Sequence, residues 1–179
     1  MVYPTIDLEQ KLWDKGIKLV AGIDEAGRGP LAGPVVAGCV CITSPEQVVD
    51  IVRDSKKMTE RQRNVAFDLI KEKSLGYGVG VVDAKRIDEI GIKYAVLEAM
   101  TKAINEVEKM LKQRIDYIIA DGGIYLIEDY NMESINHGDL NHYSFAAGSV
   151  LAKVTRDRMM YEYANRYPKY GFEKHVGYG

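Results

Sequence analysis

Hydrophobic positions recur along this chain with two different periods, one typical of helices and one of strands. The clearest helical pattern runs from about 92 to 113, where apolar residues recur at three- and four-residue spacing. The predicted buried face of this helix consists of Ile92, Ala95, Val96, Ala99, Ala103, Ile104, Val107 and Met110. Further helices are predicted over 6–16, over 60–73 with Thr59 as N-cap, and over 143–165.

Short apolar and β-branched runs predict five strands. They are KLVAGID, which ends at Asp24 and Glu25, then VVAGCVCI, LGYGVGVV, DYIIAD, which ends at Asp121, and a segment near MESIN. Together the elements predict an α/β domain with a mixed five-stranded sheet flanked by helices, antiparallel at first and parallel later. Ligands of such sheets gather at the carboxyl ends of strands, where these three acidic residues fall.

Length and composition favour one globular domain. The chain has 179 residues, of which 46% are hydrophobic and 28% charged. We expect a single domain over 1–179, with 1–17 as an N-terminal helical extension. No apolar run is long enough to span a bilayer, and the polar start lacks a secretory signal. Cys39 and Cys41 have no partner pair with zinc spacing, so we expect buried thiols and a cytoplasmic protein.

Charge alone does not decide the function. The formal net charge is −2, but basic residues are concentrated over 53–63 and 153–175. These zones could face phosphates, and solvated helix faces would explain them equally well.

The acidic residues suggest a metal-dependent hydrolysis. Cleaving a phosphodiester requires an activated water and stabilised charge on two oxygens, which two divalent ions held by carboxylates supply. Asp24, Glu25, Asp121 and Asp139 would provide oxygen ligands for Mg²⁺ if the fold brings them together. Asp24 and Glu25 point in opposite directions in an extended strand, so we expect the strand to end there. Taken singly, each acid is better explained as an ordinary strand-end or cap residue.

The glycine-rich segment 27–34 follows the acidic pair. It lacks the Gly-Lys-Ser/Thr ending of a Walker loop and leads into a strand, which argues against nucleoside triphosphate binding. Its exposed backbone amides would suit a closely approaching sugar–phosphate backbone, and a plain tight turn is the alternative.

Several motifs in a fixed order resemble the bacterial type of the ribonuclease HII family. They are GIDEAGRGPLAGPVV, Asp54–Thr59, Asp121-Gly122, His137-Gly138-Asp139, Ser149–Arg158, Tyr167–Phe172 and His175–Tyr178. The resemblance implies a ribonuclease H-like fold and a monomeric, Mg²⁺- or Mn²⁺-dependent endonuclease. Its implied substrates are RNA–DNA hybrids and duplex DNA containing single ribonucleotides. It also implies that Asp24, Glu25, Asp121 and Asp139 are the catalytic metal ligands.

The resemblance further implies the substrate contacts. Gly27, Arg28 and Gly29 would lie against the ribose and read its 2′-hydroxyl. Ser55 and Lys56 would hold phosphate, and Tyr178 would stack on the next sugar. Ser149 and Lys153 belong to a helix expected to line the groove, as does Arg156, for which a structural role is the alternative.

Three positions depart from the family pattern. His137 and Val176 stand where lysine is usual, which weakens phosphate attraction. Gly148 replaces a usual alanine, at a helix-propensity cost of about 1 kcal/mol. The family's further C-terminal helix is also missing, as in a truncated or naturally short form. The alternatives to an active nuclease are a nucleic-acid-binding module that has lost activity and a nucleotide-binding regulatory domain.

Overall fold

The computed structural model describes residues 3–121, 130–135 and 142–179. Within these ranges five strands form one sheet in the order β3-β2-β1-β4-β5. The strands are β1 (Val20–Ala26), β2 (Val35–Ile42), β3 (Gly76–Val82), β4 (Tyr117–Asp121) and β5 (Met132–Ile135). Strand β2 is antiparallel to β1 and β3, whereas β4 is parallel to β1 and β5. The predicted mixed sheet, antiparallel at first and parallel later, is confirmed.

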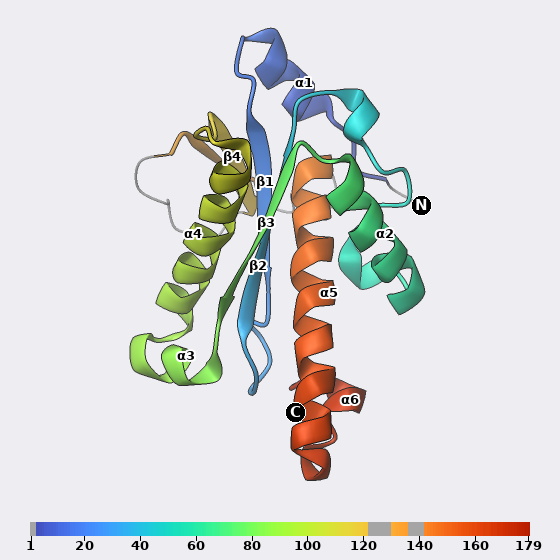
Figure 1. Ribbon diagram of the computed structural model, residues 1–179, viewed down its shortest axis with the longest axis vertical. Coiled ribbons are helices and arrows are strands. Elements are labelled where there is room, and N and C mark those ends of the chain that lie inside the picture. The colour runs from blue at the N-terminus through green and yellow to red at the C-terminus, as the bar shows by residue number, and fades with distance from the viewer. Residues whose placement is uncertain (1–2, 122–129, 136–141) are drawn as a thin grey trace.

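Helices cover both faces of this sheet (Figure 1). The described helices are α1 (Asp7–Asp14), α2 (Glu60–Lys73), α3 (Ala84–Ile90), α4 (Ile92–Leu111), α5 (Tyr143–Arg166) and α6 (Phe172–His175). Short 3₁₀ segments are η1 (Pro45–Gln47), η2 (Ser55–Lys57) and η4 (Pro168–Tyr170). Helix α4 lies on one face and α5 on the other, with α2 beside α5. Every helix that the structure describes is too short or too polar to cross a lipid bilayer.

Local sequence signals explain where two helices begin. Thr59 caps α2 through a capping box, in which its hydroxyl accepts from the Gln62 N–H and the Gln62 side chain accepts from the Thr59 N–H. The Asp83 carboxylate caps α3 by accepting from the Arg86 N–H at 2.8 Å. Helix α3 was not predicted, because it has only seven residues and none of them is buried.

Helix α4 confirms most of its predicted buried face. The prediction was wrong for Ile92 and Met110, which are 36% and 48% exposed. At the C-terminal end Leu111, and not Met110, packs against the start of β3 at Gly76. Met100 is buried instead, within the apolar face that covers the sheet.

Helix α5 approaches β1 and β2 unusually closely, because glycines face each other there. A Cβ on Gly38 would lie 2.2 Å from the Gly148 carbonyl oxygen, and one on Gly22 would lie 2.1 Å from the Phe145 nitrogen. A Cβ on Gly148 would itself lie 2.6 Å from the Gly38 oxygen. Gly148 therefore has a packing role that its helix propensity does not reveal.

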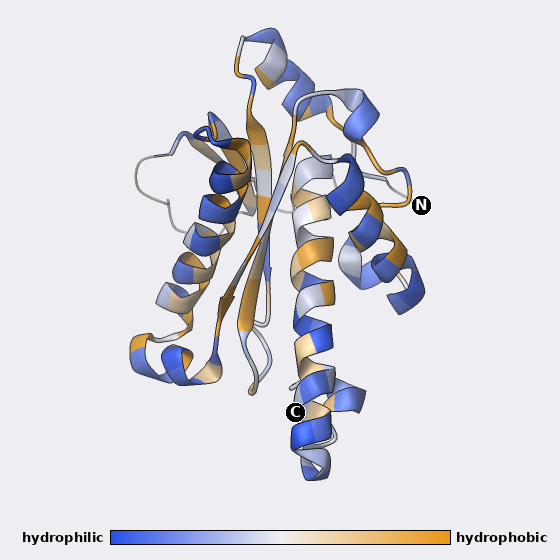
Figure 2. Ribbon diagram, viewed as in Figure 1, coloured by the Kyte–Doolittle hydropathy of each residue, from blue (hydrophilic) through white to orange (hydrophobic). Residues whose placement is uncertain are grey.

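The core on the other face contains both cysteines. Cys39 and Cys41 are fully buried, free, and packed in the layer between β2 and α4. Burial raises the pKa of Cys41 to about 12 and that of Cys39 well above its ordinary value. The prediction of buried thiols is confirmed. In Figure 2 hydrophobic residues (orange) are concentrated in β1 and β2, whereas the C-terminal end of α5 is mostly hydrophilic (blue).

Candidate active site

A pocket of about 320 Å³ opens at the carboxyl end of β1. It collects residues from β1, the following loop, η2, α5 and the segment after α6. Its lining residues are Asp24, Glu25, Ala26, Gly27, Arg28, Gly29, Ser55, Lys56, Phe145, Ser149, Lys153, Arg156 and Tyr178. The structure thus brings together ten of the twelve residues predicted from the motifs.

The acidic pair lies within β1 and not at its end, which corrects the expectation that the strand stops there. Pairing with β2 continues through Asp24, Glu25 and Ala26. Pairing with β4, however, stops at Ile23. Among the described residues no partner on the β4 side pairs with Asp24 or Glu25, and both side chains line the pocket.

The register of the parallel strands places a third acid beside this pair. Ala120 of β4 pairs with Ile23 of β1, and Asp121 and Asp24 are the next residues on the two strands. Asp139, the fourth predicted ligand, lies outside the described residues, as does His137. In the described parts of the chain no three His, Cys, Asp or Glu side chains form a cluster that could hold a metal.

The glycine-rich loop brings its backbone to the pocket. Gly27 has φ +101°, and a Cβ there would lie 2.4 Å from the Pro34 oxygen, so a side chain does not fit. Gly29 is exposed, and the nearest atom to its missing Cβ is Cε1 of Tyr178 at 3.7 Å. The half-exposed Arg28 guanidinium lies 3.7 Å from the Glu25 carboxylate.

Helix α5 and η2 contribute further residues to the pocket. The hydroxyls of Ser55 and Ser149 are buried and hydrogen-bonded to each other at 2.9 Å. Arg63 donates to the Ser55 carbonyl oxygen at 3.1 Å, which fixes the turn that carries Lys56. The Lys153 ammonium is held by Asp157 at 2.8 Å. The two lysines, Lys56 and Lys153, therefore line the same pocket as the two carboxylates.

Phe145 is a lining residue that the motifs did not indicate, and Arg156 was left between two roles. Phe145 is 1% exposed and packs with Val20 and Ile119. Arg156 is also 1% exposed, although it is charged. Arg156 is four residues from both Ala152 and Met160, so all three lie on the same apolar face of the helix. A charged residue on such a face is a sequence signal for a buried guanidinium that is hydrogen-bonded.

Solved structures define the class of protein to which this architecture belongs. The ribonuclease H2 of Pyrococcus horikoshii OT3 is 30% identical and matches with a TM-score of 0.75, over 90% of this chain and 81% of that one. Bst-RNase HIII in complex with Mn²⁺ matches with a TM-score of 0.69 at 20% identity, over 84% and 55% of the two chains. The chain has a ribonuclease H-like α/β fold.

The family follows from the sequence comparisons. The family model for Ribonuclease HII matches residues 21–179. The Ribonuclease HII of Caldanaerobacter subterraneus subsp. tengcongensis is 47% identical over 173 residues, which cover 96% of this chain and 69% of the relative. The chain belongs to the ribonuclease HII family, whose members are endonucleases, and the predicted resemblance is confirmed. The chain spans 65% of the length of two other relatives that are also named Ribonuclease HII.

Proposed function

We propose that this chain is an endoribonuclease that cuts the RNA strand of RNA–DNA hybrids and also cuts at single ribonucleotides embedded in duplex DNA. The observation that supports this most is the pocket itself. It combines adjacent carboxylates, an exposed glycine backbone, two lysines and a half-exposed tyrosine within one concave site. Such a combination suits a substrate with a sugar, a phosphate and a water to be activated. We further propose that residues 1–179 form one catalytic domain that acts as a cytoplasmic monomer.

The donor set fits a hard divalent cation. Asp24 and Glu25 offer carboxylate oxygens in the pocket, and Asp121 occupies the next position on the parallel strand. We assign these three residues and Asp139 as the ligands of Mg²⁺ or Mn²⁺, the ion named for Bst-RNase HIII. When two such ions are bound, they would supply an activated water and stabilise the attacking and leaving oxygens. The products would carry 5′-phosphate and 3′-hydroxyl ends.

The remaining residues would position the substrate. Backbone groups of Gly27 and Gly29, with Arg28 beside them, can reach a ribose 2′-hydroxyl, the group that distinguishes RNA from DNA. Lys56 and Lys153 line the same pocket, where the Ser55–Ser149 hydrogen bond connects the segments that carry them, and they would hold phosphates. The ring of Tyr178 would lie on the sugar that follows the ribonucleotide.

A cleavage assay with four substrates tests this proposal. The purified chain is incubated with a long RNA–DNA hybrid, a DNA duplex with one ribonucleotide, an all-DNA duplex and single-stranded RNA. We expect cleavage of the first two in Mg²⁺ or Mn²⁺ and no cleavage in EDTA, with 5′-phosphates at the new ends. Hybrid binding without cleavage in either metal would indicate a module that binds nucleic acid only. Equal cleavage of the all-DNA duplex would contradict recognition of the ribose.

A further inference from the structure

Arg156 connects two segments that each contribute residues to the pocket. Its Nε donates to the Pro34 carbonyl oxygen at 3.0 Å, and its Nη2 donates to that of Ala32 at 3.0 Å. Its Nη1 donates to the carbonyl oxygen of Val176 at 2.8 Å. One side chain of α5 therefore holds the end of the glycine-rich loop and the segment before Tyr178 at the same time.

The segment that carries Tyr178 is fixed by close backbone contacts. The Leu31 N–H donates to the Gly177 carbonyl oxygen at 2.9 Å. Gly177 is buried with φ +92°, and a Cβ there would lie 2.3 Å from the Ala32 oxygen. The Gly177 N–H in turn donates to Nδ1 of His175 at 3.2 Å. These contacts leave the Tyr178 ring half-exposed but beside Gly29.

The chemistry at Arg156 requires a guanidinium. Three N–H groups diverge in one plane toward carbonyls on two separate segments, which matches the rigid fork of arginine and not the compact ammonium of lysine. Burial lowers the pKa of Arg156 from its ordinary value, since desolvation disfavours the charged form. The guanidinium stays charged, and the three carbonyl dipoles offset the cost of its desolvation.

We propose that Arg156 is a positioning residue that sets the distance between the Tyr178 ring and the backbone at Gly29. This inference rests on the proposed function, in which the two groups contact adjacent nucleotides. A single embedded ribonucleotide offers one 2′-hydroxyl, so both contacts must be made at once. A long hybrid offers a 2′-hydroxyl at every position of its RNA strand and tolerates a change in this distance better. Arg156 thus acts on substrate choice through Tyr178, without touching the reacting atoms.

The test measures a discrimination ratio, defined as kcat/KM on the single-ribonucleotide duplex divided by kcat/KM on the long hybrid. We expect Arg156→Lys to lower this ratio roughly tenfold, the lower end of what one stacked ring contributes. We expect the double variant with Tyr178→Ala to have the same ratio as Tyr178→Ala alone. The ratio of dissociation constants, single-ribonucleotide duplex over long hybrid, is measured by fluorescence anisotropy in EDTA and should rise, because weaker binding of the single-ribonucleotide duplex raises its dissociation constant.

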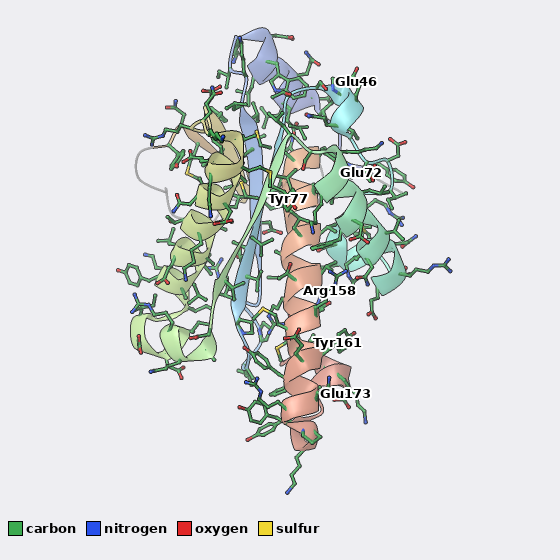
Figure 3. The ribbon with its side chains drawn as sticks, viewed as in Figure 1. Glu46, Glu72, Tyr77, Arg158, Tyr161 and Glu173 are labelled. Atoms are coloured by element: carbon green, nitrogen blue, oxygen red, sulfur yellow. The ribbon has the colours of Figure 1, made fainter. Side chains whose placement is uncertain are left out.

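A matched control comes from the same helix. Arg158 lies on the side of α5 that faces α2 (Figure 3), where it contacts Asn64 and Phe67, and it does not line the pocket. Arg158→Lys should leave both ratios unchanged. All assays are run well below the thermal unfolding midpoint of each variant.

Each outcome decides the proposal. Equal losses on both duplexes, or a further fall of the ratio in the double variant, would overturn it, because Arg156 would then be a general structural residue. If Arg156→Lys does not fold, Gly177→Ala displaces the same segment while the guanidinium is kept. A lower ratio in that variant supports the proposal and an unchanged one overturns it. If the wild-type chain cuts neither duplex, the proposed function fails, and the anisotropy ratios still decide the role of Arg156.

Discussion

Glu9 in α1 accepts two hydrogen bonds from Ser144 at the start of α5, although 135 residues separate them in the chain. The backbone N–H of Ser144 donates at 3.0 Å and its hydroxyl at 2.7 Å, and both residues are fully buried. A carboxylate at this place also complements the positive end of the helix dipole. The Tyr143 N–H donates to the Thr5 carbonyl oxygen next to this contact. The N-terminal segment is therefore a cap on the helix that carries Ser149 and Lys153.

Removing this carboxylate should destabilise the protein. We expect Glu9→Ala to lower the free energy of unfolding by about 2–4 kcal/mol, because two buried donors lose their acceptor. Glu9→Gln keeps an acceptor oxygen and should lose less, about 1–2 kcal/mol. Glu72→Gln, on the exposed side of α2 (Figure 3), is the control and should change it by at most about 0.5 kcal/mol. Urea denaturation measures all three, and a Glu9→Ala value equal to the control would contradict the capping role.

The structure shows which features were predictable from sequence and which were not. The helix at Ile92–Leu111 and the strand at Val35–Ile42 have strong local periodicity, and both were predicted. The pocket residues were predicted because they lie in ordered motifs. The Glu9–Ser144 contact left no local signal, since it depends on packing between distant segments.

Two further failures have the same origin in tertiary contacts. Local reasoning ended the first strand at Asp24 and Glu25, but pairing with β2 extends it to Ala26. Helix propensity counted Gly148 as a cost, whereas the approach of α5 to Gly38 leaves no space for a Cβ. The end of β1 and the role of Gly148 each depend on the neighbouring element, which the local sequence does not identify.

Neutralising a predicted metal ligand should abolish cleavage and leave the fold intact. We expect Asp24→Asn and Asp121→Asn each to reduce kcat by on the order of 10²–10³-fold or more, because each keeps the side-chain shape but removes a charge. In EDTA the thermal midpoint should not fall, since clustered carboxylates repel one another without metal. Asp68→Asn, on the exposed side of α2, is the matched control. Near-wild-type turnover by Asp24→Asn at saturating Mg²⁺ would remove that residue from the ligand set.

Lys56 should contribute to binding through phosphate alone. Lys56→Ala should weaken binding to all hybrid sequences by a similar factor and reduce the slope of log K against log salt by about 0.7–0.9. The neighbouring Lys57 pairs with Asp54 at 3.7 Å and does not line the pocket, so Lys57→Ala is the control. Titrations at several salt concentrations provide the measurement. A loss that depends on sequence would show that Lys56 contacts bases.

The two cysteines should be inert in the folded protein. Burial raises the pKa of Cys41 from 9.0 to about 12, so little reactive thiolate exists at pH 8. We expect iodoacetamide to label neither cysteine in the native chain and both in guanidinium chloride, as counted by mass spectrometry. The raised pKa also favours folding fully below pH 9, and this contribution is lost as the pH rises toward 12. Rapid native labelling of either thiol at pH 8 would contradict this burial.

Tyr178 should matter most for a single embedded ribonucleotide. Tyr178 is 51% exposed with its ring beside Gly29, and its backbone N–H donates to the His175 carbonyl oxygen at 2.9 Å, so the residue is held and accessible. We expect Tyr178→Ala to reduce kcat/KM on the single-ribonucleotide duplex roughly ten- to a hundredfold, by analogy with the range of about 1–3 kcal/mol for a base stacked on an aromatic ring. The loss on a long hybrid should be smaller, because other 2′-hydroxyls remain available there.

The conservative variant separates the ring from the hydroxyl. Tyr178→Phe keeps the surface that would lie on the sugar, so we expect near-wild-type kcat/KM on both duplexes. A large loss in Tyr178→Phe would move the contribution to the phenolic hydroxyl, which stacking does not require. Equal losses on both duplexes in Tyr178→Ala would make the ring a general binding surface. No loss on either would make it a packing residue, since a ring that touches the substrate cannot be removed without a change in kcat/KM.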